Sequence, residues 1–276
     1  MSFKLSFSTL ACPDWDLQRV LDTAARLGFN GVELRFLSGR SDLDRLPEFT
    51  GARLAESRRA ITDRNLAIAC VDTDVHFHWP DAAKRRENVD EGVRMADLAA
   101  ALGAPGIRIF GDKIQPGQTR EQTRAWTSEG MCALAEKTRG HGVEVWIETH
   151  GDFANWHDTR EILQAAKCAG VGAVWDPENC YDAYFEKPAD GAKALGAYIR
   201  HVHYKDIHRD AKGQWIPALM GKGEFPLLDT LNALRRLGYG RFVSFEWEKK
   251  WHPEIPDADV ALPQFMQWMR TNWKNS

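Results

Sequence analysis

Strand-like and helix-like segments alternate along the whole chain, and this alternation restricts the fold more than any other feature. Short apolar runs are each followed by a stretch with helical periodicity, and the pattern repeats eight times in 276 residues. The predicted strands span residues 5–9, 31–35, 67–72, 106–110, 143–148, 172–176, 198–203 and 242–246. The predicted helices span residues 17–27, 53–64, 82–102, 120–140, 159–169, 188–195, 227–237 and 260–273.

Eight such units predict an α/β fold in which parallel strands close into a (β/α)8 TIM barrel, whose usual length is about 250 residues. Glycines lie shortly before several predicted strands, where a left-handed cap ends a helix. They are Gly28, Gly103, Gly140, Gly170 and Gly238. A doubly wound sheet is disfavoured because no GxGxxG follows the first strand. We therefore expect residues 1–276 to form a single barrel domain.

Charge, cysteine spacing and hydropathy disfavour several classes of protein. The formal net charge of -3 gives no basic excess for binding nucleic acid. The five cysteines lack CxxC spacing, as expected for reduced thiols. No apolar stretch could span a bilayer, and Asp14 and Asp16 interrupt any N-terminal signal core. We expect a cytoplasmic protein that binds a small molecule, with neither nucleic acid nor membrane as a partner; a homo-oligomer is compatible with the sequence.

The fifth to eighth predicted strands each end in a residue that can bind a metal. These residues are Glu148, Asp176, His203 and Glu246. Singly, each could form an ion pair, cap a turn or be a core histidine. Together they lie at the rim where barrels build their active sites, and they predict one shared metal site. One imidazole and three carboxylates favour Mn²⁺, while Mg²⁺, Zn²⁺ and Co²⁺ are also compatible.

Several motifs of the chain resemble those of one enzyme family. They are Ile147-Glu148-Thr149-His150, Trp175-Asp176-Pro177, His201-Val202-His203-Tyr204-Lys205-Asp206, Ser244-Phe245-Glu246, Gly31-Val32-Glu33-Leu34-Arg35 and Gly221-Lys222-Gly223-Glu224-Phe225. As a set they resemble the sugar phosphate isomerase/epimerase family, which has the xylose isomerase-like TIM barrel. The resemblance implies that the four residues above bind the metal and that His150 and Lys205 lie near the substrate. One departure is Asn179, where relatives often have a histidine; because asparagine cannot transfer a proton, substrate orientation or reaction type can differ here.

The expected chemistry is proton transfer next to a carbonyl group. A metal that bridges a carbonyl and the neighbouring hydroxyl acidifies the C–H bond between them and stabilises the enediolate that follows. By analogy with epimerases of this family, Glu148 and Glu246 are the predicted proton-transfer groups. We expect a metal-dependent isomerase or epimerase acting on a sugar or polyol, namely a ketose, keto-acid or polyol derivative.

Three other functions remain alternatives. A dehydratase acting on a keto-inositol begins with the same proton abstraction and then loses hydroxide. An endonuclease IV-like DNA repair enzyme is less favoured because it needs several more histidine ligands and a basic surface for DNA. A sugar-binding barrel without catalysis is also less favoured because acid/base candidates are present.

Other polar residues near the rim are candidates for substrate binding. Arg108 lies near the end of the fourth strand, and Glu33 and Arg35 share a face near the end of the second. They could bind hydroxyls or a carboxylate, or pair with one another. Lys205 could hold a carboxylate, a phosphate or an enediolate oxygen, with an ion pair to a neighbouring aspartate as the alternative. His78 is expected to line the pocket mouth.

Two residues are expected to support the site from behind the ligands. His201 shares a strand face with His203 but lies deeper in the barrel, and Asn179 follows Asp176. The longest insert, residues 208–225, follows the seventh strand and is expected to be able to cover the site. Of the 11 tryptophans, Trp251 is one of those near the rim, where a flat ring suits a sugar.

Overall fold

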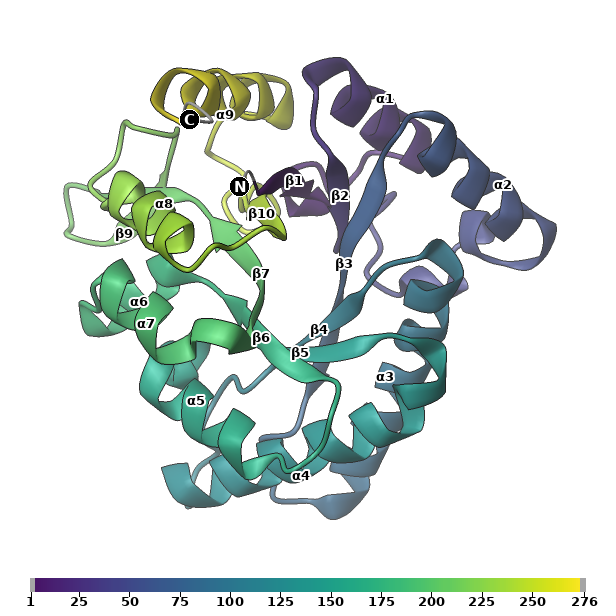
Figure 1. Ribbon diagram of the computed structural model, residues 1–276, viewed down its shortest axis with the longest axis vertical. Helices are drawn as coiled ribbons and strands as arrows, with labels where there is room; N and C mark the ends of the chain where they lie inside the picture. Colours follow the sequence, from purple (N-terminus) through teal and green to yellow (C-terminus); the bar gives the residue numbers. More distant parts are fainter. Residues whose placement is uncertain (1–2, 274–276) are drawn as a thin grey trace.

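Eight parallel strands form the centre of the molecule. The structure is a computed structural model and describes residues 3–273. The central strands are β1 (Lys4–Ser8), β2 (Gly31–Leu34), β3 (Ala67–His76), β4 (Gly106–Phe110), β5 (Glu144–Glu148), β6 (Val171–Trp175), β7 (Ile199–Tyr204) and β10 (Phe242–Phe245). They close into a barrel in the order β1-β10-β7-β6-β5-β4-β3-β2 (Figure 1). The predicted (β/α)8 fold class is confirmed.

Helices surround the barrel on its outside (Figure 1). They are α1 (Leu17–Leu27), α2 (Gly51–Asp63), α3 (Ala82–Leu102), α4 (Arg120–Thr138), α5 (Trp156–Ala165), α6 (Pro177–Tyr184), α7 (Pro188–Leu195), α8 (Leu227–Arg236) and α9 (Ala258–Asn272). All eight helices expected from the sequence are present, with ends that differ by up to a few residues. None of the helices among residues 3–273 combines the length and apolar character that crossing a membrane requires.

The short helix α6 was not expected from the sequence. Asp176 is its N-cap, and Pro177 occupies the first turn, where a missing backbone N–H costs nothing. This Asp-Pro pair was the signal for a helix start, but eight residues are too few for a clear helical period. The helix matters for function because it begins directly at a predicted metal ligand.

The insert after β7 folds as an antiparallel hairpin of β8 (Asp206–Arg209) and β9 (Trp215–Ala218). The Asp206 carboxylate anchors it by accepting hydrogen bonds from the backbone N–H groups of Gly221, Gly223 and Phe225. The hairpin packs sideways on α6, with the rings of Trp215 and Tyr181 6.1 Å apart. The expectation that the insert can cover the site is wrong, because none of residues 208–225 lines the cavity at the C-terminal end of the barrel.

A small apolar layer fills the barrel interior below the functional end. It consists of Cys70, Trp146 and Val174. Gly106 leaves room for the indole, since a Cβ there would lie 2.3 Å from the Trp146 ring. The Trp146 ring also stacks on His201 with centroids 6.1 Å apart, so the apolar layer directly supports the polar one above it.

Candidate metal centre and cavity

Three carboxylates surround one imidazole nitrogen at the C-terminal end of the barrel. Nδ1 of His203 lies 3.1 Å from Oε1 of Glu148 and 3.2 Å from Oε1 of Glu246. The same nitrogen lies 3.8 Å from Oδ2 of Asp176. All four side chains are buried, and one ligand atom of each lies within 4.8 Å of the others. The structure thus brings together the four residues that the sequence suggests as metal ligands.

The two carboxylate oxygens of Asp176 have different partners. Oδ1 accepts hydrogen bonds from the backbone N–H groups of Glu178 and Asn179, both at 2.9 Å, and so caps α6. Oδ2 faces His203 and Lys205. The capping role and the ligand role, which are alternatives at the level of the sequence, are therefore compatible in one side chain.

Lys205 joins four carboxylates. Its Nζ lies 2.7 Å from Glu246, 2.7 Å from Glu248, 2.9 Å from Asp176 and 3.4 Å from Glu178. Burial opposes the charge on Lys205, but Asp176 and Glu246 outweigh it and raise the pKa well above its ordinary value. Lys205 is therefore an ammonium group, and it pairs with these carboxylates rather than with Asp206.

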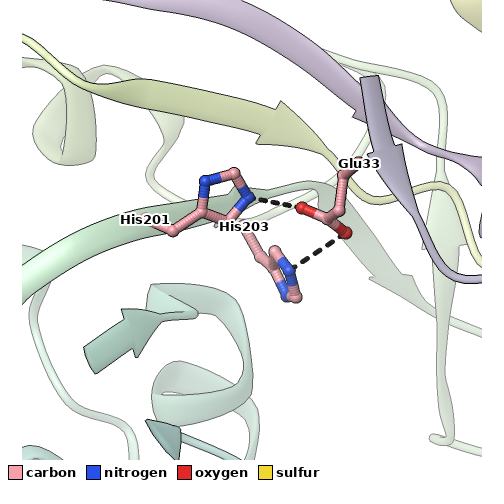
Figure 2. Close-up of side chains that lie close together, drawn as sticks. All are labelled: Glu33, His201 and His203. Carbon is pink, nitrogen blue, oxygen red and sulfur yellow. Dashed lines mark hydrogen bonds and ion pairs between the residues drawn. The ribbon is translucent and has the colours of Figure 1, made fainter. Parts of the chain in front are cut away.

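Glu33 holds the two histidines of β7 from below the ligands. Figure 2 shows its carboxylate facing both imidazole rings. One oxygen contacts Nε2 of His201, and the other lies 3.3 Å from Nε2 of His203. All three side chains are fully buried. Because Glu33 faces Nε2 of His203, the opposite ring nitrogen, Nδ1, is the one directed at the three carboxylates.

Arg108 and Asp72 form a second buried pair next to the ligands. Arg108 Nη2 lies 3.3 Å from Asp72, and its Nε lies 3.2 Å from Glu148. Burial and the nearby charge of Glu33 raise the pKa of Asp72 to about 8. Arg108 remains a cation, because its carboxylate neighbours outweigh burial and raise its pKa. It therefore supplies positive charge to Glu148.

A cavity of about 380 Å³ opens directly above this layer. It is lined by Leu10, Arg35, Asp74, Arg108, Phe110, Glu148, His150, Asn179, Lys205, Glu246, Glu248 and Trp251. Of the four ligand candidates, Glu148 and Glu246 reach the cavity wall, while Asp176 and His203 lie beneath it and are fully buried. A second hollow of about 440 Å³ beside Trp15 and Arg19 lies away from this cluster.

Most predicted substrate-binding residues reach the cavity, but two do not. His150, Lys205, Arg108 and Arg35 line it. Glu33 does not, and its contacts assign it to support of the histidines instead. His78 is also buried outside the cavity wall, with Nδ1 3.8 Å from Asp112, and burial together with His76 lowers its pKa to about 4.

The two residues expected behind the ligands differ in position. His201 lies below His203, bound to Glu33, as its place on the strand suggests. Asn179 lines the cavity, and its amide donates a hydrogen bond to the carbonyl oxygen of Thr149 at 3.1 Å. Asn179 is thus accessible to a substrate while its amide is held in place by the end of β5.

Four carboxylates of the site were missed in the sequence, and one of them, Asp74, lies on the cavity wall two residues beyond the predicted third strand. Asp72 ends the predicted third strand, as Glu148 ends the fifth, and that parallel was a usable signal. Glu178 and Glu248 each lie two residues after a ligand candidate. Residues that far beyond a strand end cannot be placed without the loop conformation, so their contacts with Lys205 were not predictable from spacing.

The cluster fits a divalent cation. Buried carboxylates need compensating charge, and three of them meet at His203 with Lys205 and Arg108 as the cations beside them. His203 lies 3.1 to 3.8 Å from one oxygen of each carboxylate, so all four groups converge on one point. Three oxygens and one nitrogen suit a hard or borderline divalent ion.

With this geometry established, comparison with known proteins places the chain in a family. A model of the xylose isomerase-like TIM barrel family matches residues 21–272, and the chain belongs to this family. No curated protein matches the sequence.

Solved structures with the same fold are enzymes of low sequence identity to this chain. The probable 3-DHS dehydratase AsbF from Bacillus anthracis, involved in petrobactin synthesis, has 19% identity and a TM-score of 0.80, covering 99% of this chain and 100% of its own. The 3-keto-D-glucoside 4-epimerase YcjR from E. coli has 16% identity and a TM-score of 0.78, with coverage of 98% and 100%. A D-psicose 3-epimerase has 15% identity and a TM-score of 0.79, with coverage of 98% and 99%.

Proposed function

We propose that the protein is a divalent-metal-dependent isomerase or epimerase that moves a proton on a ketose, keto-acid or polyol derivative. One observation carries this proposal. Glu148 and Glu246 belong to the ligand cluster and also line the cavity, so they can reach a substrate. They come from β5 and the end of β10, with β6 and β7 between them in the barrel. Two carboxylates on different sides of one cavity suit removal and return of a proton.

The protonation states of these residues are compatible with acid/base work. Burial by itself raises the pKa of Glu246, but the charges of His203 and Lys205 outweigh it and hold the pKa well below its ordinary value. Burial of Glu148 is likewise outweighed by His203 and Arg108, which lower its pKa. In the metal-free protein both glutamates are therefore carboxylates, the form that can bind a metal or accept a proton.

Glu148, Asp176, His203 and Glu246 would hold the ion, for which Mn²⁺ is the best-suited candidate. A bound divalent ion supplies Lewis acidity that polarises the substrate carbonyl and stabilises the enediolate. Lys205 and Arg108 hold the carboxylates in position and stay protonated throughout. Asn179 can orient the substrate by hydrogen bonding but cannot transfer a proton. The two glutamates thus carry the proton transfers in this proposal.

A dehydratase is the second candidate, and one structural neighbour is described as a probable dehydratase. Dehydration starts with the same proton abstraction next to a carbonyl and then expels a hydroxyl group. The two reactions differ in product mass, because isomerisation conserves mass and dehydration removes one water. Mass spectrometry of the product therefore separates them.

The test is metal-dependent exchange of substrate C–H for solvent deuterium. Purified protein is stripped with EDTA, reloaded with Mn²⁺, Mg²⁺, Zn²⁺ or Co²⁺, and incubated with ketoses, keto-acids and keto-inositols in D₂O. We expect exchange that needs metal and disappears in Glu148→Gln. Glu186→Gln, a partly buried carboxyl outside the cavity, is the matched control. If no substrate exchanges with any metal, the proposal is wrong.

A further inference from the structure

Two arginines line the β2–β4 side of the cavity with part of each guanidinium group unused. Arg35 follows β2 and Arg108 belongs to β4, and their exposed fractions are only 6% and 2%. The Nη1 atom of each is buried and has no hydrogen-bond partner among residues 3–273. A buried N–H group without a partner is costly, and both arginine side chains line the cavity, so a ligand that brings acceptors next to them can satisfy these donors.

The carboxylates near these arginines do not occupy these donors. Asp74 contacts Nη2 of Arg35 at 2.5 Å and is half exposed at the cavity mouth. Asp72 contacts Nη2 of Arg108, and Glu148 lies near Nε of Arg108. A guanidinium group has five N–H donors, so each arginine keeps its Nη1 side for another acceptor.

Aromatic rings limit the movement of both guanidinium groups. The guanidinium of Arg108 lies 3.8 Å from the ring centre of Phe110, and that of Arg35 lies 4.8 Å from the ring centre of Phe36. A guanidinium held over an aromatic ring is attracted to it, so both groups are restrained before a ligand arrives. This restraint lowers the entropic cost of binding.

The opposite side of the cavity has a different character. Glu246 and Glu248, which follow β10, line it, with Lys205 already paired to carboxylates. Neutral hydroxyl groups can donate to these carboxylates, whereas an anionic group would be repelled by them. A substrate that is neutral at its reacting end and anionic at its other end matches both sides.

We propose that the substrate is a sugar acid, whose carboxylate is bound by Arg35 and Arg108 while its hydroxy-ketone faces Glu148 and Glu246. This rests on the proposed function and narrows its substrate class. A monoanionic, planar carboxylate matches the flat guanidinium donors. A phosphate dianion would bring a second negative charge close to Asp74 and Glu148, and it is the less suitable group.

The test compares substrates that differ only at one carbon. D-fructuronate, D-fructose and D-fructose 6-phosphate share a ketose skeleton and carry carboxylate, hydroxyl or phosphate at C6; D-tagaturonate and D-tagatose form a second pair. We expect kcat/KM for deuterium exchange to be about 10- to 100-fold higher for the uronates, as hydrogen bonds to a charged group imply. Equal rates for uronate and neutral ketose, or preference for the phosphate, would overturn the proposal while leaving the enolising function intact.

Substitutions at Arg35 test whether this arginine causes the preference for uronates over neutral ketoses. Arg35→Met should raise KM for the uronates with little change for the neutral ketoses, and Arg35→Lys should restore part of the loss. Arg40→Met is the matched control, because Arg40 belongs to the same segment after β2 as Arg35 and pairs with Asp42, but does not line the cavity. An unchanged uronate preference in Arg35→Met would contradict the assignment.

A binding measurement keeps the two proposals separable. If no compound undergoes exchange, the proposed function fails, and thermal stabilisation by D-fructuronate or D-tagaturonate still tests the carboxylate site. Stabilisation by a uronate but not by its neutral ketose, lost in Arg35→Met, would support the site independently of turnover. Absence of stabilisation by both uronates in the unsubstituted protein would overturn it.

Discussion

Buried charge is paired differently in two layers at the functional end of the barrel, an upper layer around Lys205 and a lower layer around Glu33. In the upper layer, Glu246, Glu248 and Asp176 share one ammonium group, that of Lys205. In the lower layer, the single carboxylate of Glu33 serves two imidazoles. The upper layer has more carboxylates than cations and can accept a divalent ion, whereas the lower layer has a single carboxylate, which lies between two imidazoles and orients His203. An excess of buried negative charge therefore distinguishes the reactive layer from its support.

The substitution Glu246→Gln in the upper, reactive layer is expected to have the largest effect, which is on activity. Glutamine keeps the shape but removes the negative charge and the proton-accepting oxygen. We expect kcat for deuterium exchange to fall about 100- to 10,000-fold, the usual range for loss of general acid/base catalysis. Unchanged turnover would exclude Glu246 from proton transfer and leave it at most a ligand.

The second-largest effect is expected on stability, when the cation of the same layer is removed. Lys205→Met leaves the carboxylates of Asp176, Glu246 and Glu248 without their shared ammonium. We expect the metal-free protein to lose about 3–5 kcal/mol of unfolding free energy, as when one partner of a buried pair is removed. Urea unfolding in EDTA measures this.

Metal should offset part of that loss, because a divalent ion attracts the same carboxylates. The stabilisation of Lys205→Met by Mn²⁺ should therefore equal or exceed that of the unsubstituted protein. A smaller stabilisation would indicate that Lys205 helps to bind the ion rather than competing with it. Lys250→Met, whose ammonium lies outside this cluster, is the control.

A smaller effect is expected from the supporting layer. Glu33→Gln removes the charge that faces Nε2 of His203 while preserving the side-chain shape. We expect Mn²⁺ affinity to fall about 10- to 100-fold, as is usual for the partners of metal-binding histidines. Competition with a fluorescent chelator measures it. Glu144→Gln, on the same barrel but bonded to Arg200 and Trp146, should leave the affinity unchanged.

Per pH unit, the smallest effect is a pH dependence from Asp72, which lies beside the supporting layer. Burial and the charge of Glu33 raise the folded-state pKa of Asp72 to about 8, whereas the unfolded chain has the ordinary aspartate value of about 3.9. Between these values the folded state holds one more proton, so stability falls as pH rises through this window, by up to about 1.4 kcal/mol per pH unit. Asp72→Asn should flatten this slope, measured by urea unfolding in EDTA at pH 5, 6 and 7. An equally steep slope in the variant would show that Asp72 is ionised in the folded protein.

The two layers also differ in how well the positions of their residues could be predicted from the sequence. The upper ligands end successive strands, and parallel strands of a barrel end at one rim, so the chain itself predicts their proximity. The role of Glu33 was not foreseen in this way. Its place near the end of the second strand suggested a cavity residue, but the stagger of strands in a closed barrel sets it level with His201 and His203. Sequence position alone does not give depth.

The sequence by itself determined the barrel, because eight repeats of a period-two strand and a longer helical segment have few other ways to bury their apolar faces. It also determined which residue types meet at the rim, since strand ends are set by the same periodicity. Only the tertiary structure decided how charges pair there: that Lys205 binds carboxylates from two neighbouring loops, that Asp176 divides its oxygens between a helix and the site, and that Arg35 and Arg108 keep unused donors. Pairing depends on distances of a few ångströms between residues far apart in the chain, which barrel closure and loop conformation set and local pattern does not.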